Sequence, residues 1–79
     1  SVKVTGIRIS YHDRRFRFAW ESEATSLTLE VRGASGDLLA LIGPQIGVGA
    51  GRSELFRSGD YRLGVRASDG AWRVQVIEA

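Results

Sequence analysis

Few residues in this 79-residue chain could carry out catalysis or bind a metal. His12 is the only histidine, it lies beside Asp13, and the chain contains no cysteine. A Ser/His/Asp arrangement would also need a serine and an oxyanion hole, and no motif places either of them near His12. A single histidine without cysteine is a poor donor set for zinc. We therefore expect neither nucleophilic catalysis nor a zinc site.

The acidic residues are scattered along the chain rather than grouped. A glycosidase needs two carboxylates that face each other across a cleft, and a domain this small has little room for one. Loop oxygens near Asp60 or Asp69 could hold calcium, but the spacing of an EF-hand loop is absent. The sequence thus predicts a protein that is not an enzyme and that binds no cofactor.

Segment 43–52 is rich in glycine and invites comparison with a phosphate-binding loop. It lacks the G-K-[ST] ending, and no helix is expected after it whose N-terminus could hold a phosphate. We expect a mobile loop between two strands, which contains Pro44, the only proline of the chain. Such a loop could still contact a partner.

Arginine far outnumbers lysine in this chain. Ten of the eleven basic residues are arginines, and only Lys3 is a lysine. Guanidinium groups make planar, bidentate contacts with anions. Codon usage in a GC-rich genome would produce the same bias without any function. The net charge is only +2, and nine acidic residues are interspersed, which argues against a polybasic tail that binds nucleic acid.

The elements that must position these arginines are β-strands, because apolar and polar residues alternate along most of the chain. The expected strands span 2–10, 15–20, 26–32, 37–42, 52–57, 61–67 and 72–76. The apolar parity changes at Gly6, which predicts a bulge there. The last two strands flank Asp69-Gly70, a pair that favours a two-residue hairpin turn. This turn would place Arg66 opposite Arg73 on the outer face.

Strands 15–20 and 26–32 are expected to pair directly, which would place Arg17 opposite Glu30. The alternation of arginines with aromatic residues in the first of these strands resembles strands that bind nucleic acids through exposed rings. Here, however, the aromatic residues fall on the face opposite to the arginines, and they are needed for the core. Nucleic acid is therefore the less favoured partner.

Seven or so short strands separated by turn signals predict an all-β fold, a two-layer antiparallel β-sandwich with an immunoglobulin- or fibronectin-like Greek key. Segment 55–61 resembles the tyrosine corner of such sandwiches, so that the Tyr61 hydroxyl should bond to backbone a few residues upstream. Residues 1–79 form a single domain, and because the chain begins with serine we expect it to be excised from a longer protein. No apolar stretch approaches the roughly 18 residues of a membrane span, so we expect no insertion into a membrane.

The immunoglobulin-like arrangement would bring the strand of Tyr61 beside the first aromatic strand. One exposed sheet face would then carry the candidate ligand or partner residues, which are Arg15, Arg17, Arg62, Arg66 and Arg73. Such a face suits an acidic protein, an acidic glycan or a polyphosphate. The alternative is that these long side chains separate and find Glu30, Glu78 or water.

Segment 59–76 resembles the C-terminal end of small β-sandwich modules of bacterial secreted and cell-envelope proteins, with the pattern G-x-Y-x-L-x-V-x-A followed by G-x-W-x-V-x-V. The matching residues are Gly59, Tyr61, Leu63, Val65, Ala67, Gly70, Trp72, Val74 and Val76, with one extra residue before Gly70. The resemblance implies an extracytoplasmic accessory domain, in the periplasm, in the envelope or secreted, and no functional residues carry over from it.

We accordingly predict a non-catalytic interaction module that contacts a protein, a surface or a glycan. One alternative is the binding of an anion or nucleic acid by the arginine face. Another is a structural or oligomerising domain, because exposed edge strands can pair between chains.

Overall fold

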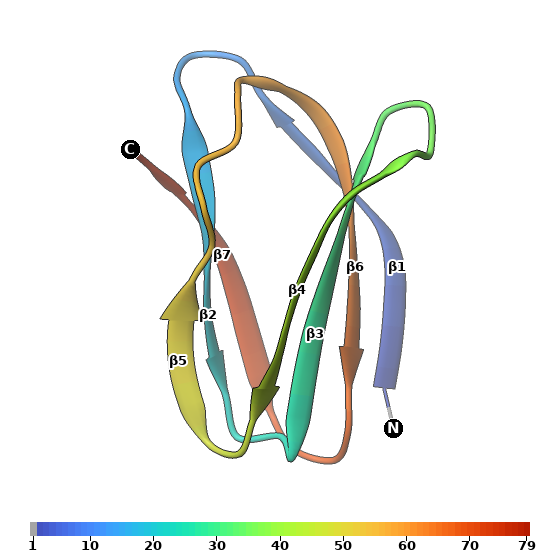
Figure 1. Ribbon diagram of the computed structural model, residues 1–79, viewed down its shortest axis with the longest axis vertical. Helices are drawn as coiled ribbons and strands as arrows, with labels where there is room; N and C mark the ends of the chain where they lie inside the picture. The colour runs from blue at the N-terminus through green and yellow to red at the C-terminus, as the bar shows by residue number, and fades with distance from the viewer. Residues whose placement is uncertain (1) are drawn as a thin grey trace.

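The computed structural model describes residues 2–79, which form seven β-strands in two antiparallel sheets. The strands are β1 (Val2–Tyr11), β2 (Phe16–Ser22), β3 (Ser26–Gly33), β4 (Leu38–Ile46), β5 (Gly49–Arg52), β6 (Gly59–Ala67) and β7 (Trp72–Glu78). One sheet has four strands in the order β1-β6-β3-β4, and the other has three in the order β5-β2-β7. The two sheets face each other as two layers (Figure 1). The predicted all-β sandwich is therefore confirmed.

The core lies between the sheets and is formed by the alternating residues that the sequence predicts to point inward. The fully or almost fully buried apolar residues are Phe16, Phe18, Ala24, Leu27, Leu29, Val31, Leu63, Val65 and Ala67. Phe16 is the centre of an aromatic cluster, since its ring lies 5.4–5.8 Å from the rings of four other aromatic residues, which are Tyr11, Phe18, Phe56 and Tyr61. This cluster joins both sheets at one end of the sandwich. Aromatic rings bury more apolar area than any other side chains, so the cluster contributes strongly to the core.

Two local predictions are confirmed. The register of β1 against β6 shifts by one residue between Val4 and Ile7, and Gly6 has a φ of +74° there, so the bulge exists. The Tyr61 hydroxyl donates a hydrogen bond of 2.7 Å to the carbonyl oxygen of Arg57, as expected for a tyrosine corner. Both features depend on neighbouring residues in the sequence, which explains why the sequence alone reveals them.

The predicted hairpin between β6 and β7 is wrong, because these strands belong to different sheets. Strand β6 pairs with β1 and β3, whereas β7 pairs with β2. The link through Asp69-Gly70 crosses from one sheet to the other, and Arg66 and Arg73 consequently lie on opposite sides of the molecule. A crossing link and a hairpin turn place the same alternate residues in the core, so the apolar pattern cannot distinguish them.

The predicted pairing of strands 15–20 and 26–32 is wrong for the same reason. Strand β2 pairs with β5 and β7, and β3 pairs with β4 and β6, so that Arg17 is not opposite Glu30. The terminal strands also depart from the immunoglobulin arrangement, in which the first strand pairs with the second and the last with the sixth. Here β1 pairs with β6 and β7 with β2, so the two terminal strands have exchanged sheets.

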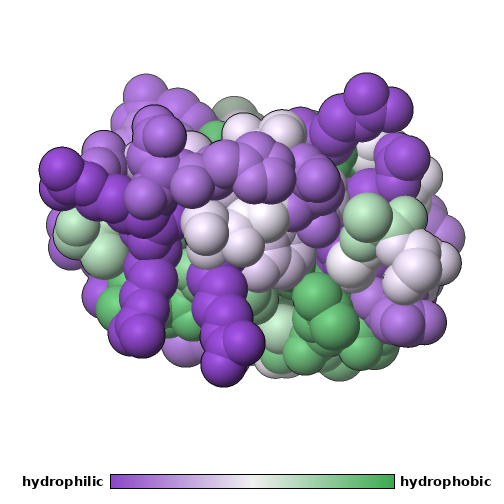
Figure 2. Space-filling view, turned by 90° about the horizontal axis from the view of Figure 1, so that it is seen from above, coloured by the Kyte–Doolittle hydropathy of each residue, from purple (hydrophilic) through white to green (hydrophobic). Residues whose placement is uncertain are grey.

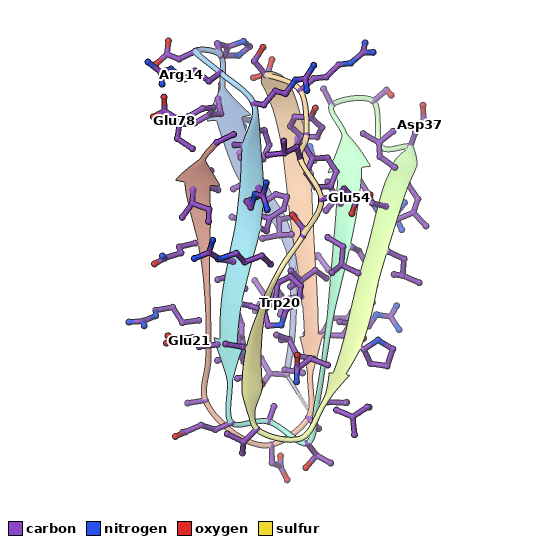
Figure 3. The ribbon with its side chains drawn as sticks, turned by 60° about the vertical axis from the view of Figure 1, so that its left-hand side comes forward. Arg14, Trp20, Glu21, Asp37, Glu54 and Glu78 are labelled. Carbon is purple, nitrogen blue, oxygen red and sulfur yellow. The ribbon has the colours of Figure 1, made fainter. Side chains whose placement is uncertain are left out.

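The glycine-rich segment is also more regular than predicted. Strand β4 continues to Ile46 and β5 occupies Gly49–Arg52, whereas 53–57 contains only an isolated bridge instead of the expected strand. A Cβ atom at Gly51 would lie only 2.5 Å from the ring of Trp20, which explains the glycine by close packing rather than by flexibility. Figure 3 shows Trp20 beside β5, while its neighbour Glu21 points away from the molecule.

Candidate functional site

The five arginines expected on one face are divided between the two sheets. Arg62 and Arg66 lie on the outer face of the four-stranded sheet, because they alternate with the buried Leu63, Val65 and Ala67 of β6. Arg17 and Arg73 lie on the outer face of the three-stranded sheet, and Arg15 lies in the turn before β2. The single arginine face is therefore wrong, because it rested on the incorrect neighbours of β2 and β6.

The outer face of the four-stranded sheet nevertheless carries an excess of positive charge. Its basic residues are Lys3, Arg8, Arg32, Arg62 and Arg66, and its acidic residues are Glu30 and Asp60. Five positive and two negative charges give this face a net charge of +3, which exceeds the +2 of the whole chain. The remaining acidic residues thus lie elsewhere on the molecule.

Three of these arginines form a row across neighbouring strands. Arg62 is directly opposite Arg8 of β1 on one side and directly opposite Arg32 of β3 on the other. Neighbouring strands are about 4.7–4.9 Å apart, so the outer two Cα atoms of the row are about 10 Å apart. Like charges that are directly opposite each other destabilise a sheet. We name Arg8, Arg62 and Arg32 the arginine row.

The bulge at Gly6 is what brings Arg8 into this row. In the register before the bulge Val4 pairs with Val65, and in the register after it Ile7 pairs with Leu63. Without the extra residue, Arg8 would be opposite Tyr61, whose ring points into the core. The bulge shifts the strand by one position, so that Ile7 and Ile9 enter the core and Arg8 faces outward.

Glu30 neutralises only part of this face. One of its carboxylate oxygens lies 2.7 Å from Nε of Arg66, and the other lies 3.4 Å from an amino nitrogen of Arg32. The Glu30 side chain is only 15% exposed, so its carboxylate lies close to the sheet surface between these two arginines. Among the described residues, neither Arg8 nor Arg62 has a carboxylate oxygen within 4.0 Å.

Asp60 is the other acidic residue of this face, and it is already engaged. The Ser10 hydroxyl donates a hydrogen bond of 2.7 Å to its carboxylate, and His12 Nε2 lies 3.0 Å from the same oxygen. The hydrogen bond from Ser10 is the main cause that lowers the pKa of Asp60, followed by that from His12, while the charge of Arg8 contributes least. Asp60 is therefore ionised at neutral pH and borders a hollow of about 320 Å³ that Arg8 and Arg62 also line.

The outer face of the three-stranded sheet has its own shallow hollow of about 330 Å³. Its floor contains the small side chains of Ala19 and Ala50, and Arg52, Arg73 and Gln75 stand around it. Arg73 is bonded to Glu21 across the β2–β7 pair. This face thus carries fewer unpaired charges than the face of the arginine row.

Strand β4 is the third surface of interest, because it is an open sheet edge that exposes large apolar side chains. Leu38, Leu39 and Leu41 are 50%, 55% and 61% exposed, and Ile46 is 68% exposed. Leu41 is opposite Glu30 and Leu38 is opposite Arg32, so the apolar edge adjoins the basic face. Seen from above, the molecule is mostly hydrophilic, and its hydrophobic surface is gathered along one side (Figure 2).

The part of the chain that the structure describes shows no centre for metal chemistry. Within residues 2–79, no group of three or more His, Cys, Asp and Glu side chains could hold a metal ion. His12 faces Asp60 at an exposed end of the sandwich, where Arg14 and Glu78 also form an ion pair (Figure 3). No helix within the same residues has the length and hydrophobicity to cross a membrane.

Comparisons with protein families, with curated proteins and with solved structures returned no match. The function must therefore be argued from the surfaces described above.

Sequence reasoning missed Arg8 and Arg32 as members of the candidate site. The alternation around Arg8 shows that it points outward, but it does not show that its neighbour is Arg62, more than 50 residues away in the chain. The identity of neighbouring strands is a property of the tertiary fold, and it is what assembles the row.

Proposed function

We propose that this domain is a non-catalytic interaction module that joins a second copy of itself through the open edge of β4. The observation that carries the proposal is the character of this edge. Strand β4 is hydrogen-bonded to β3 on one side only, and its nine residues Leu38–Ile46 include no charged residue. A strand edge presents unpaired N–H and C=O groups, which are a template for pairing with another chain.

The other three sheet edges carry charged residues or are short, whereas β4 is long and uncharged. Strand β1 carries Lys3 and Arg8, β7 carries Arg73 and Glu78, and β5 is only four residues long and ends at Arg52. Charges and short strands are the usual means by which proteins prevent pairing of sheet edges. In β4, Pro44 and two register shifts against β3, one at Leu39 and one at residues 43–44, interrupt the edge, so the regular stretch 40–42 remains competent to pair.

The sequence of β4 favours a second copy as the occupant, because it is self-complementary. An antiparallel pairing with its two-fold axis at Leu41 would place Leu41 against Leu41 and Ala40 against Ile42 of the partner, within the regular stretch 40–42. Every cross-strand pair is then apolar, and no like charges meet. A two-fold interface of this kind closes on itself and gives a dimer rather than a fibre.

The wider role proposed for this dimer is that of an accessory unit in an extracytoplasmic protein. That location is supported by the resemblance of segment 59–76 to envelope modules, and it stays a prediction. Edge pairing would serve such a protein by joining two chains side by side without a cofactor.

Sedimentation equilibrium on the wild-type domain and on two lysine variants tests the proposal. Leu39→Lys places a charge on the edge, whereas Val48→Lys makes the same change on the link between β4 and β5, where the side chain is 78% exposed. We expect a concentration-dependent dimer for the wild type and for Val48→Lys, and a monomer for Leu39→Lys. Circular dichroism checks that both variants are folded. A wild-type protein that stays monomeric at millimolar concentration, or equal effects of the two variants, would refute the proposal.

A further inference from the structure

The structure points to a second binding site, independent of β4, on the outer face of the four-stranded sheet. We propose that this face binds a linear acidic glycan, and that a sulfate or carboxylate group of the glycan lies over Arg62, between Arg8 and Arg32. The proposal rests on the arginine row, on the lack of carboxylate partners for two of its members, and on the mixed charge of the surrounding face.

The first argument concerns the cost of the arginine row in the free protein. Three arginines occupy directly opposed positions on neighbouring strands, which is unfavourable for like charges; Arg32 is relieved by Glu30 and by the carbonyl oxygen of Gly36, whereas Arg8 and Arg62 have no carboxylate partner among residues 2–79. An oxyanion above Arg62 would remove this repulsion and accept bidentate hydrogen bonds from planar guanidinium groups. The binding of an anion therefore lowers the electrostatic repulsion within the arginine row.

The second argument is that no acidic side chain of the described chain already occupies this position. Glu30 is bound to Arg66 and to Arg32, and Asp60 is bound to Ser10 and His12. Arg8 and Arg62 are exposed, and neither has a carboxylate oxygen within 4.0 Å in residues 2–79. Both arginines line the hollow of about 320 Å³, so their guanidinium groups are accessible to a ligand.

The third argument selects an acidic glycan among the polyanions. Tyr61 borders the hollow, but its ring and that of Tyr11 pack against Phe16 in the core, so bases of a single-stranded nucleic acid would find no free ring on which to stack. Glu30 and Asp60 would repel a chain made of anionic groups alone, such as polyphosphate. A glycan also carries neutral hydroxyl groups, which can donate hydrogen bonds to these two carboxylates.

A second pair of cations continues the site along the sheet. Lys3 is opposite Arg66, and Arg66 lies four positions after Arg62 in β6, which corresponds to about 13 Å. Gly64 lies between them and has no side chain, and Glu30 is directly opposite it, so the Glu30 carboxylate lies beside the strip between the two pairs of cations. The face can thus hold two anionic groups of one linear chain, one over each pair of cations.

The experiment measures binding of a heparin-derived hexasaccharide by isothermal titration calorimetry. The double variant Arg8→Gln/Arg62→Gln removes two positive charges from the site. Its matched control, Arg17→Gln/Arg52→Gln, removes two charges from the outer face of the opposite sheet, where neither arginine has a carboxylate within 4.0 Å among residues 2–79. Both variants change the formal net charge from +2 to 0, so that nonspecific attraction falls equally.

We expect the site variant to bind the hexasaccharide at least about tenfold more weakly and the control variant to change less than about twofold, since the loss of one charged hydrogen bond can be worth a factor of ten. Arg62→Lys keeps the charge and loses the planar fork, and we expect about a threefold to tenfold loss for it. This single variant carries the test if the double variant does not fold. Equal losses in the site and control variants, or unchanged binding by Arg62→Lys and by the site variant, would overturn the proposal.

Two further titrations distinguish the source of the anion. Single-stranded DNA and polyphosphate of matched charge are titrated under the same salt conditions, because counterion release dominates the binding of any polyanion. Weaker binding of both than of the hexasaccharide supports a glycan site. Equal or tighter binding of either one would show a general polyanion surface and would refute the assignment to a glycan.

Discussion

Gly70 is the residue at which the hairpin interpretation and the tertiary structure predict different results. In a two-residue hairpin turn, asparagine would replace this glycine at the cost of the positive φ alone, because its Cβ would point into solvent. In the structure, a Cβ atom at Gly70 would lie 2.6 Å from the carbonyl oxygen of Glu23 and 2.8 Å from Cα of Ala24. Gly36 is the matched control, since its φ of +98° is also positive and nothing lies within 4 Å of its added Cβ.

The two variants share one energetic cost and differ in another. At positive φ, a residue with a side chain costs about 1–2 kcal/mol, and this applies to Gly36→Asn and to Gly70→Asn alike. At Gly70, the new Cβ must also displace the backbone of Glu23 and Ala24 and break the 2.8 Å hydrogen bond from the Glu23 N–H to Ala71 O. Leaving such a donor unpaired adds about 1–3 kcal/mol.

The expected loss at Gly70 is therefore about 2–5 kcal/mol, the sum of the two costs. A domain of 79 residues has a free energy of unfolding of about 4–12 kcal/mol, so Gly70→Asn should lose a large part of it. Guanidinium chloride unfolding, followed by the fluorescence of Trp20 and Trp72, measures both variants. If Gly70→Asn and Gly36→Asn lose the same free energy, the backbone of residues 23 and 24 does not pack on Gly70, and the crossing link is wrong.

Two further predictions concern the polar contacts at the ends of the sheets. Tyr61→Phe should lower the free energy of unfolding by about 1 kcal/mol, because it removes the hydrogen bond to Arg57 O; an unchanged denaturation midpoint would contradict the tyrosine corner. For Ser10→Ala, the sign follows from the pKa of Asp60, which folding lowers below its ordinary value of 3.8. A carboxyl group whose pKa is lowered by folding stabilises the fold at pH values above its ordinary pKa. This stabilisation is lost as the pH falls through the lowered pKa. Ser10→Ala should thus be destabilised at neutral pH and approach the wild type in acid, as measured by urea unfolding across this pH range; a loss independent of pH would refute this account.

Local sequence patterns predicted the fold class and the orientation of side chains correctly. The alternation in 16–20, 27–31 and 61–67 identified the residues that form the core, because the side chains of a strand point to opposite faces in turn. Gly6 and Tyr61 were recognised because a bulge and a tyrosine corner involve residues close together in the chain. These features need no knowledge of which strands are neighbours.

The neighbours of each strand could not be obtained from the same patterns. A hairpin and a link between sheets bury the same alternate residues, so the Asp69-Gly70 turn was compatible with both. The expected single arginine face failed as a consequence, since it assumed that β2 and β6 share a sheet. The glycines at 49 and 51 were likewise taken as signs of flexibility, whereas the structure places them against Gln45 and Trp20.

The sequence by itself determined that this protein is an all-β sandwich with aromatic and aliphatic residues inside and arginines outside. Only the tertiary structure decided which arginines meet, because Arg8, Arg62 and Arg32 lie on strands that are distant in sequence and adjacent in the sheet. It also decided that β4 is an open edge, since this depends on the absence of a further strand beside it in the described chain. Side-chain direction follows from the local period of a strand, whereas proximity follows from the pairing of strands, which is a property of the whole fold.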